Sequence, residues 1–109
     1  MATFFRNKVI NELGTTPTTI ADSTQTSRIT IIGLSICNLK DHVIKASVQL
    51  SDNSSSQGYY IKDVIIPPGQ SLRVVNGGEK LVMAESNILT AFCDTEGGAD
   101  VISSYVEIV

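Results

Sequence analysis

The sequence predicts an all-β fold, a single antiparallel β-sandwich or jelly-roll-like domain of about eight strands. The chain has 109 residues, which is enough for one domain and too few for two. Short runs of β-branched and aromatic residues alternate with turn-forming Gly, Pro, Asn and Asp along nearly the whole chain. No stretch shows the apolar spacing of a capped amphipathic helix, so strands are the expected element throughout.

The first third of the chain contains three expected strands of different character. Residues 4–13 open the chain with a mixed apolar and polar run. Residues 15–21 are rich in Thr and contain Pro17, which has no amide hydrogen to donate, so an edge strand is expected there. Residues 27–37 form the most apolar run and the expected central strand, and Gly33 predicts a bulge or a close approach by another backbone.

Strands also account for the rest of the chain. Residues 43–50 alternate apolar and polar side chains with a period of two, which is typical of a half-buried strand. The polar segment 51–58 follows as a loop or hairpin tip. The remaining expected strands are residues 59–66, 72–75, 80–83, 88–93 and 101–109.

Two turn-forming segments flank the short run 72–75, and they could indicate either a phosphate loop or β-sheet corners. A phosphate loop needs a following helix whose N-terminal amides face the anion, but strand-like residues follow the Asn-Gly-Gly segment. Asn-Gly between two strands instead predicts a tight hairpin turn, because both residues tolerate positive φ. The Pro-Pro-Gly segment upstream predicts a chain reversal. We expect structural turns, and no phosphate site, at Pro67, Pro68, Gly69, Asn76, Gly77 and Gly78.

Residues 1–13 are expected to form an N-terminal segment that acts as a docking arm, and residues 14–109 to form the sandwich domain. The segment's apolar side chains suit a strand or a helical turn or two equally well, and they add area that a small core does not fully absorb. Two adjacent tyrosines point to opposite faces of a strand, so one is expected in the core and one at an interface. The candidate interface residues are Phe4, Phe5, Val9, Ile10, Tyr59 and Tyr60.

The charge distribution and the N-terminal sequence argue against two classes of partner. Eight basic residues are scattered among eleven acidic ones, for a formal net charge of -3, whereas nucleic-acid binding needs a concentrated basic surface. The N-terminal residues contain no apolar stretch long enough for a signal peptide or a membrane span. We therefore expect folding in a cytoplasm, with neither a nucleic acid nor a membrane as partner.

No constellation of residues predicts catalysis, a cofactor or a metal site. His42 is the only histidine and lies in a polar connection, where a solvated turn residue is the expected role. Asp94, Glu96 and Asp100 could supply oxygen ligands to calcium, but no bidentate Glu follows at the required distance. An acidic hairpin loop is the expected role of that segment. The sequence therefore predicts a protein that is not an enzyme.

The two cysteines, Cys37 and Cys93, lie far apart inside apolar segments and form no CxxC pair. Buried free thiols are favoured for such positions. A disulfide between them requires neighbouring strands, which the sequence does not determine.

The sharpest sequence features are IPPGQSLRVVNGGEKLVM, residues 66–83, and the closing DVISSYVEIV, residues 100–109. With these, residues 7–109 resemble small virion structural proteins of tailed bacteriophages, particularly those of T4-like cyanophages. The resemblance implies a small β-sandwich that is incorporated in many copies into the virus particle, and it carries no catalytic motif.

These observations together predict a structural protein of the virion, assembled in the host cytoplasm. A capsid decoration protein bound to the outer shell is the favoured role, and a tail, neck or baseplate component is the alternative within that class. A small β-sandwich module that binds a ligand or receptor is the alternative from another class. The expected partners are further copies of the chain, in a trimer or another closed ring, and the major capsid protein or tail proteins.

Overall fold

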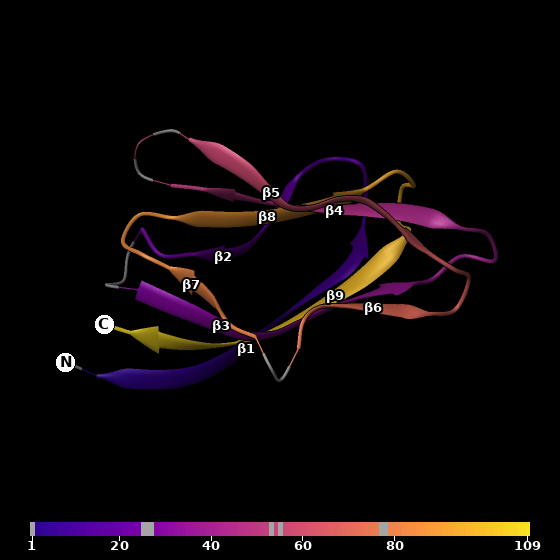
Figure 1. The fold of residues 1–109 in the computed structure, drawn as a ribbon. Helices are drawn as coiled ribbons and strands as arrows, with labels where there is room; N and C mark the ends of the chain where they lie inside the picture. The colour runs from indigo at the N-terminus through magenta and orange to yellow at the C-terminus, as the bar shows by residue number, and fades with distance from the viewer. Residues whose placement is uncertain (1, 25–27, 53, 55, 77–78) are drawn as a thin grey trace.

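The computed structural model describes residues 2–24, 28–52, 54, 56–76 and 79–109. These residues form nine β-strands in two packed antiparallel sheets and contain no helix (Figure 1), which confirms the predicted all-β sandwich. The strands are β1 (Thr3–Leu13), β2 (Thr18–Asp22), β3 (Arg28–Asn38), β4 (Ile44–Ser51), β5 (Gln57–Ile66), β6 (Ser71–Val75), β7 (Leu81–Met83), β8 (Ile88–Cys93) and β9 (Ala99–Ile108).

The strands are arranged in jelly-roll order. The first sheet has the order β1-β9-β3-β6, with β7 also paired to β3, and the second sheet has the order β2-β8-β4-β5. β6 and β7 lie one after the other along the same side of β3, so they act as two pieces of one interrupted edge strand. Counted in this way, the fold agrees with the expected eight strands, and most connections cross from one sheet to the other.

The most apolar run of the sequence forms β3, the central strand of the first sheet, as predicted. Its register with β9 shifts between Ile31 and Gly33, where the sequence predicted a bulge. Ile31 is fully buried, whereas Ile32 is exposed on the outer surface of the sheet. The bulge shifts the alternation of the strand, so that Ile31 before it and Leu34 after it both face the core.

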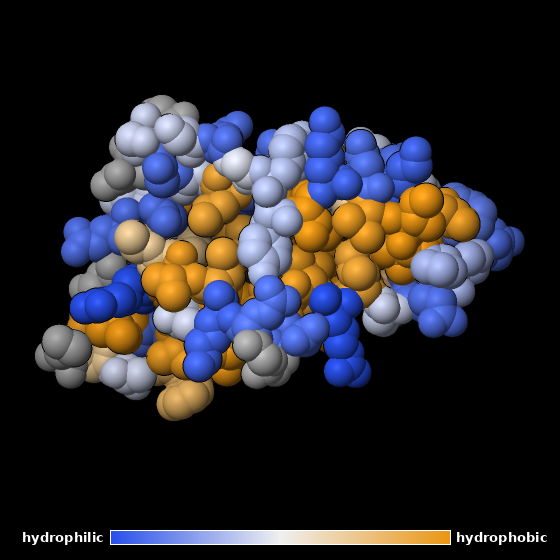
Figure 2. Space-filling view, in the orientation of Figure 1, coloured by the Kyte–Doolittle hydropathy of each residue, from blue (hydrophilic) through white to orange (hydrophobic). Residues whose placement is uncertain are grey.

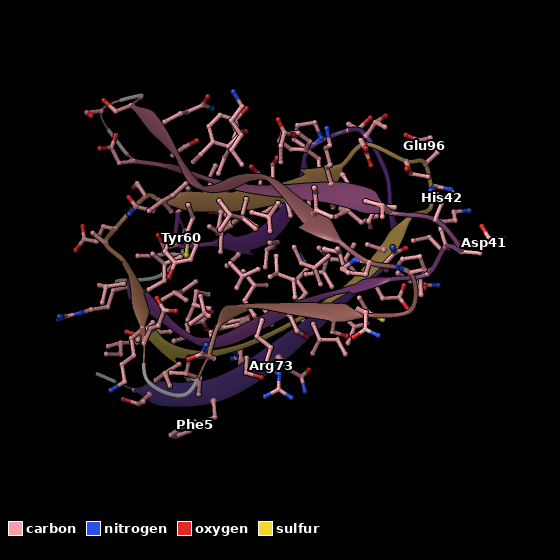
Figure 3. All side chains as sticks on the ribbon, turned by 45° about the vertical axis from the view of Figure 1, so that its right-hand side comes forward. Phe5, Asp41, His42, Tyr60, Arg73 and Glu96 are labelled. Carbon is pink, nitrogen blue, oxygen red and sulfur yellow. The ribbon has the colours of Figure 1, made fainter. Side chains whose placement is uncertain are left out.

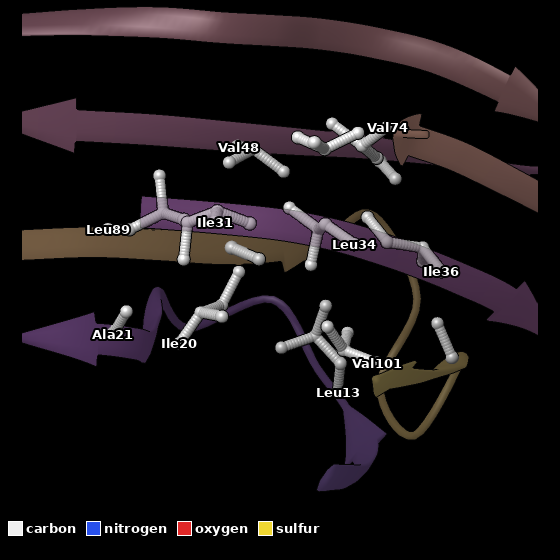
Figure 4. Packing of buried hydrophobic residues seen from close by; sticks show 14 of the residues in the cluster. Leu13, Ile20, Ala21, Ile31, Leu34, Ile36, Val48, Val74, Leu89 and Val101 are labelled. Atoms are coloured by element: carbon white, nitrogen blue, oxygen red, sulfur yellow. The ribbon is translucent and has the colours of Figure 1, made fainter. Parts of the chain in front are cut away.

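Apolar side chains from both sheets fill the space between the two layers (Figure 4). In β4 the predicted alternation holds at Ile44, Ala46 and Val48, which are fully buried. Ser47 is also buried, and its hydroxyl is satisfied by a hydrogen bond from the Asp63 amide at 2.9 Å. Burying one Ile or Leu side chain contributes roughly 1.5–3 kcal/mol, so this core is the main source of stability. Its largest members are Leu13, Ile20, Ile29, Ile31, Leu34, Ile36, Ile44, Ile66, Met83 and Leu89.

The hairpin predicted around Asn76 and Gly77 is wrong, because a hairpin requires the two flanking strands to pair with each other. Gly77 and Gly78 lie outside the described residues, but β6 and β7 do not pair with each other and run in the same direction along β3. The Asn76 carbonyl accepts a hydrogen bond from the Glu79 amide at 2.9 Å, so the chain turns locally and then continues along β3. Pairing with β3 buries Val75 and Met83, whereas the local Asn-Gly signal carries no information about that distant strand.

Two other connections join the sheets at the ends of the sandwich. Between β5 and β6, the Gln70 amide donates to the Pro67 carbonyl at 3.2 Å and Gly69 has a φ of 69°, which is the geometry of a β-turn with glycine in the left-handed region. Residues 94–98 join β8 in the second sheet to β9 in the first. This acidic segment is therefore a crossing between sheets, and the sequence-based expectation of a hairpin loop is wrong there.

Residues 3–13 lie within the first sheet as the edge strand β1. Their register with β9 runs from Thr3 opposite Ile108 to Leu13 opposite Ala99, and Leu13 is buried in the core. Deleting residues 1–13 would therefore expose the edge of β9 and remove a core side chain. The docking role of this segment stays a prediction, and it is better tested by substitutions than by truncation.

Candidate assembly surface

The outer surface of the first sheet carries five exposed apolar side chains from four of its strands. We call this surface the apolar face and define it by Phe5, Val9, Ile32, Val82 and Ile102. Residues that lie opposite each other on antiparallel strands share one side of the sheet. Such cross-strand pairs bring Val9 beside Ile102, and connect Phe5 with Val82 through residues of β9 and β3.

Three rows of side chains cross the apolar face. The middle row has the small residues Ser104 and Gly33, so the surface is lower there than in the rows on either side. Two hollows, of about 550 Å³ and 260 Å³, share Ser104 and Ile32 as lining residues. From the N-terminal end of β1, the rows are Phe5-Val106-Thr30-Val82, then Asn7-Ser104-Gly33, then Val9-Ile102-Ser35-Arg73.

The side chains of the apolar face are well exposed to solvent. Phe5 is 80% exposed, Val9 and Val82 are each 62% exposed, and Ile102 is 50% exposed. Phe5 and Arg73 project from the lower surface of the molecule in Figure 3. Single exposed apolar residues are ordinary, but several on one sheet surface usually mark a contact with another molecule.

The outer surface of the second sheet has a different composition. One row across its four strands consists of Thr19, Thr90, Gln49 and Tyr59, and in the next region Lys45 lies opposite Ile65. The side view in Figure 2 shows hydrophilic side chains along the upper rim, where the second sheet lies, and apolar side chains between the two layers. The sandwich therefore has one apolar and one mainly polar outer surface.

The structure separates the four candidate interface residues of the N-terminal segment. Phe5 and Val9 lie on the apolar face, whereas Ile10 packs against the core. Phe4 points to the other side of β1, where the Arg6 guanidinium lies 4.8 Å from its ring centroid. Arg6 also forms an ion pair with Glu107 of β9, with Nε and Oε1 3.2 Å apart.

Tyr59 and Tyr60 point to different sides of β5, as the sequence predicted. Tyr59 is exposed and has the Lys62 ammonium 5.2 Å from its ring centroid. Tyr60 packs against the core and donates its hydroxyl to Glu79 at 2.9 Å. Burial, followed by the hydrogen bond and charge of Glu79, raises the pKa of Tyr60 above its ordinary value. Tyr60 thus has a structural role, and Tyr59 remains available to a neighbour.

The acidic side chains of the segment that crosses from β8 to β9, and of Asp100 at the start of β9, accept hydrogen bonds from the backbone of other parts of the fold. Asp94 accepts from the Lys45 amide at 3.0 Å, and Asp100 accepts from the Glu12 amide at 3.0 Å. Glu96 accepts from both the hydroxyl and the amide of Thr15, and these hydrogen bonds lower the pKa of its carboxyl below its ordinary value. The three carboxylates therefore fix strand ends rather than surround a common point. Within the described ranges, no group of His, Cys, Asp and Glu could hold a metal ion.

The histidine and the cysteines occupy unrelated positions. His42 is exposed in the connection between β3 and β4, with its Nδ1 3.1 Å from the Val43 carbonyl oxygen. Cys37 is partly exposed on β3, Cys93 is buried on β8, and both are free thiols. Because the two cysteines lie in different sheets, they are not strand neighbours. No helix in the described part of the chain is long and apolar enough to cross a membrane.

Sequence reasoning missed three members of the apolar face, Ile32, Val82 and Ile102. A local signal existed for all three, because Ile32, Val82 and Ile102 each follow an adjacent apolar residue. Which member of each pair faces outward depends on the register of β3 and on the pairing of β7 and β9. Adjacent apolar residues in a strand place one side chain on each side, so one of them must leave the core.

The fold resembles that of an appendage subunit. No protein family matches the sequence, and no curated protein is significantly similar to it. A chain from the structure of Bacillus endospore appendages, described as a family of disulfide-linked pili, aligns with a TM-score of 0.59 at 7% identity. The alignment covers 98% of this chain and 88% of that one, so the two share a fold. A chain of infectious bursal disease virus strain Gx aligns with a TM-score of only 0.39 at 12% identity, and 95% of this chain spans 32% of that longer one.

Proposed function

We propose that this chain is a structural subunit of a virus particle, a bacteriophage virion protein that assembles in many copies and performs no catalysis. The observation that carries the proposal is the apolar face, on which Phe5, Val9, Val82 and Ile102 are each at least half exposed in the free chain. Covering these side chains with another protein would remove apolar area from water, which is the main favourable term in protein association.

Two other observations support assembly as the role. Residues 7–109 resemble small virion structural proteins of tailed bacteriophages over nearly the whole chain. The appendage protein with the same fold is described as a pilus, which is itself an assembly of many subunits. The jelly-roll architecture also occurs in viral capsid domains.

Within this class, we place the chain on the outside of the capsid as a decoration protein, assembled in the host cytoplasm. One apolar and one mainly polar outer surface suit a subunit that meets the shell on one side and solvent on the other. The partner at the apolar face would then be the major capsid protein. Tyr59 and Ile65, which are exposed on the second sheet, favour the second candidate, a tail, neck or baseplate subunit with neighbours on both sides.

A matched pair of substitutions tests the docking surface. Ile102→Asp places a charge on the apolar face, whereas Ile65→Asp places the same charge on the second sheet at similar exposure, 50% against 59%. We expect Ile102→Asp to lower incorporation into particles at least about tenfold, because an unpaired carboxylate would be buried at the contact. Ile65→Asp should incorporate normally if the chain decorates the shell. Equal incorporation of Ile102→Asp and the unsubstituted chain would contradict the proposed docking surface.

The copy number per particle separates the two candidates within the class. Gel densitometry of purified particles, with the major capsid protein as internal standard, measures it directly. We expect a copy number of the same order as that of the shell protein for a decoration protein. A small number of copies, together with loss of incorporation in Ile65→Asp, would instead assign the chain to the tail, neck or baseplate.

A further inference from the structure

The charged residues on the outer surface of the first sheet are distributed unevenly. Arg28 of β3 and Arg73 of β6 project outward with the residues of the apolar face, as the register of their strands requires. On the same side, the described part of the chain has one acidic residue at a paired position, Asp100 of β9. Its carboxylate already accepts a hydrogen bond from the Glu12 amide at 3.0 Å. This side of the sheet therefore carries positive charge, although the whole chain has a formal net charge of -3.

Within the described residues, neither Arg28 nor Arg73 forms an ion pair. The ion pair of this sheet joins Arg6 to Glu107, whose side chains lie on the opposite side of their strands. The Arg73 guanidinium is exposed and projects from the lower surface of the molecule in Figure 3. Arginine is enriched at protein interfaces, because its guanidinium is weakly hydrated and binds a carboxylate through two parallel hydrogen bonds. Both arginines can therefore accept carboxylates from another molecule.

Arg73 borders the smaller of the two hollows on the apolar face. This hollow, of about 260 Å³, is also lined by Ile32 and Ile102, so apolar side chains and a guanidinium lie beside each other there. Gly33 lines it as well and does not have a positive φ. A Cβ on Gly33 would lie 3.8 Å from the Ser104 Cβ, which is an ordinary contact. The backbone therefore does not require glycine at this position, and a larger residue there would occupy the hollow.

We propose that this hollow seats a segment of another protein in which an apolar side chain adjoins a carboxylate. The apolar side chain fills the space beside Ile32 and Ile102, and the carboxylate pairs with Arg73. Arg28, in a different row of the same surface, meets a second carboxylate of the partner. The inference rests on the docking of the apolar face in the proposed function, and it specifies the partner as a shell protein whose contact surface is both apolar and acidic.

Two other occupants match the charges of this surface less well. A second copy would bring the same two arginines and an aspartate that is already hydrogen-bonded, so a face-to-face contact would join surfaces of like charge. A nucleic acid needs a concentrated basic surface for its phosphates, whereas these two arginines lie in separate rows among apolar side chains. A protein surface with carboxylates around apolar side chains complements both the apolar residues and the arginines.

Two dyes of similar shape test the chemistry of the hollow without particles. Anilinonaphthalene sulfonate is apolar with one negative charge, and phenylnaphthylamine is its uncharged analogue. Fluorescence titration should show the sulfonate bound at least about fivefold more tightly than the analogue, because only the sulfonate can pair with a guanidinium. Arg73→Gln should remove this preference, whereas Lys45→Gln, at an exposed lysine of the second sheet, should leave it unchanged. No preference in the unsubstituted chain, or a preference that survives Arg73→Gln, would overturn the proposal.

Filling the hollow tests the seat in the particle. Gly33→Val adds apolar area to the face but occupies the space that the partner's side chain needs, so incorporation into particles should fall at least about fivefold. Gly58→Val makes the same change on β5 of the second sheet, where an added Cβ would have no neighbouring atom within 4 Å, and should incorporate normally. Normal or raised incorporation of Gly33→Val would show that the face docks by apolar area alone, without a seat.

Charge reversal tests the acidic partner and keeps the two proposals separate. Arg73→Glu should lower incorporation at least about tenfold, because like charges would meet at the contact, whereas Lys45→Glu should incorporate normally. Normal incorporation of Arg73→Glu together with loss in Ile102→Asp would leave the docking surface in place and overturn the acidic partner. Normal incorporation of Ile102→Asp would instead contradict the docking surface, while the dye preference still reports on the hollow. A dimer of the free chain in sedimentation equilibrium that Arg73→Glu dissociates would make a second copy the occupant and overturn the inference.

Discussion

The two outer surfaces of the sandwich differ although both sheets have strands of similar make-up. On the first sheet, one row begins with the apolar pair Val9 and Ile102 and ends with Ser35 and Arg73. The corresponding row on the second sheet consists of Thr19, Thr90, Gln49 and Tyr59. Both sheets bury apolar side chains on their inner surfaces, so the core does not require this difference. The exposed apolar side chains on the outer surface of the first sheet are not needed for the core, so they indicate a contact with another molecule.

The largest expected effect is the difference in stability loss between substitutions on the inner and on the outer surface of the first sheet. Ile36 is fully buried on β3, whereas Ile102 on the neighbouring strand faces outward. Ile36→Ala should lower the free energy of unfolding by about 2–5 kcal/mol, because it leaves a cavity in the core. Ile102→Ala should lower it by less than about 1 kcal/mol. Urea unfolding of the monomer measures both, and a larger loss in Ile102→Ala would show that the outer position packs within the chain.

The second prediction compares the two outer surfaces by their affinity for an apolar probe. Replacing Phe5 and Val82 with Ser removes two of the most exposed apolar side chains, 80% and 62% exposed. We expect affinity for a fluorescent apolar dye to fall about tenfold, from the apolar area lost. Tyr59→Ser together with Ile65→Ser, on the second sheet, should change dye affinity less than about threefold. Equal losses of dye affinity from the two double substitutions would contradict the proposed difference in apolar character between the two outer surfaces.

The third prediction concerns two adjacent serines on β9 that face opposite sides of the sheet. Ser103 is fully buried and its hydroxyl has no hydrogen-bond partner among the described residues, whereas Ser104 lies on the outer surface. Ser103→Ala should raise the free energy of unfolding by about 1 kcal/mol, since an unsatisfied buried hydroxyl is removed. Ser104→Ala should leave it within about 0.5 kcal/mol. Thermal unfolding of both variants provides the comparison, and a less stable Ser103→Ala protein would contradict it.

The smallest expected effect lies at the end of the sandwich, away from both outer surfaces. Hydrogen bonds from Thr15 lower the pKa of Glu96, so the ionised carboxylate stabilises the fold at neutral pH. This contribution is present above the ordinary pKa of a glutamate and is lost as the pH falls through the lowered value. Thr15→Val removes the hydroxyl donor and should make stability less dependent on pH in that acidic window. Melting temperatures measured from neutral to acidic pH should show the flatter profile, and an unchanged slope would exclude this role for Thr15.

Local patterns predicted the strands well because each strand must present apolar residues to a common core. Residues 43–50 alternate with a period of two and form β4, the most apolar run forms the central strand β3, and Gly33 marks the bulge. The failures came from connections. The Asn-Gly segment and the acidic segment after β8 were predicted as hairpins, although the strands they connect pair with other partners.

The candidate surface was only partly predictable for the same reason. Phe5 and Val9 were chosen as interface residues for their apolar character in an N-terminal strand, and the structure places both on the apolar face. Phe4 and Ile10 were chosen on the same grounds, yet they point to the other side of β1. The alternation of a strand decides the side of each residue, but only the pairing with β9 decides which side is outward.

By itself, the sequence determined an all-β chain with a central apolar strand. It also predicted an edge strand over residues 15–21, which the structure places at Thr18–Asp22, with Pro17 just before the strand. These properties follow from composition and from spacing over a few residues, which local backbone geometry governs. Only the tertiary structure decided that Ile32, Val82 and Ile102 lie beside Phe5 and Val9, and that β1 is an edge strand of the first sheet. Those outcomes depend on strand partners far apart in the chain, whose choice reflects burial of the whole core rather than any local signal.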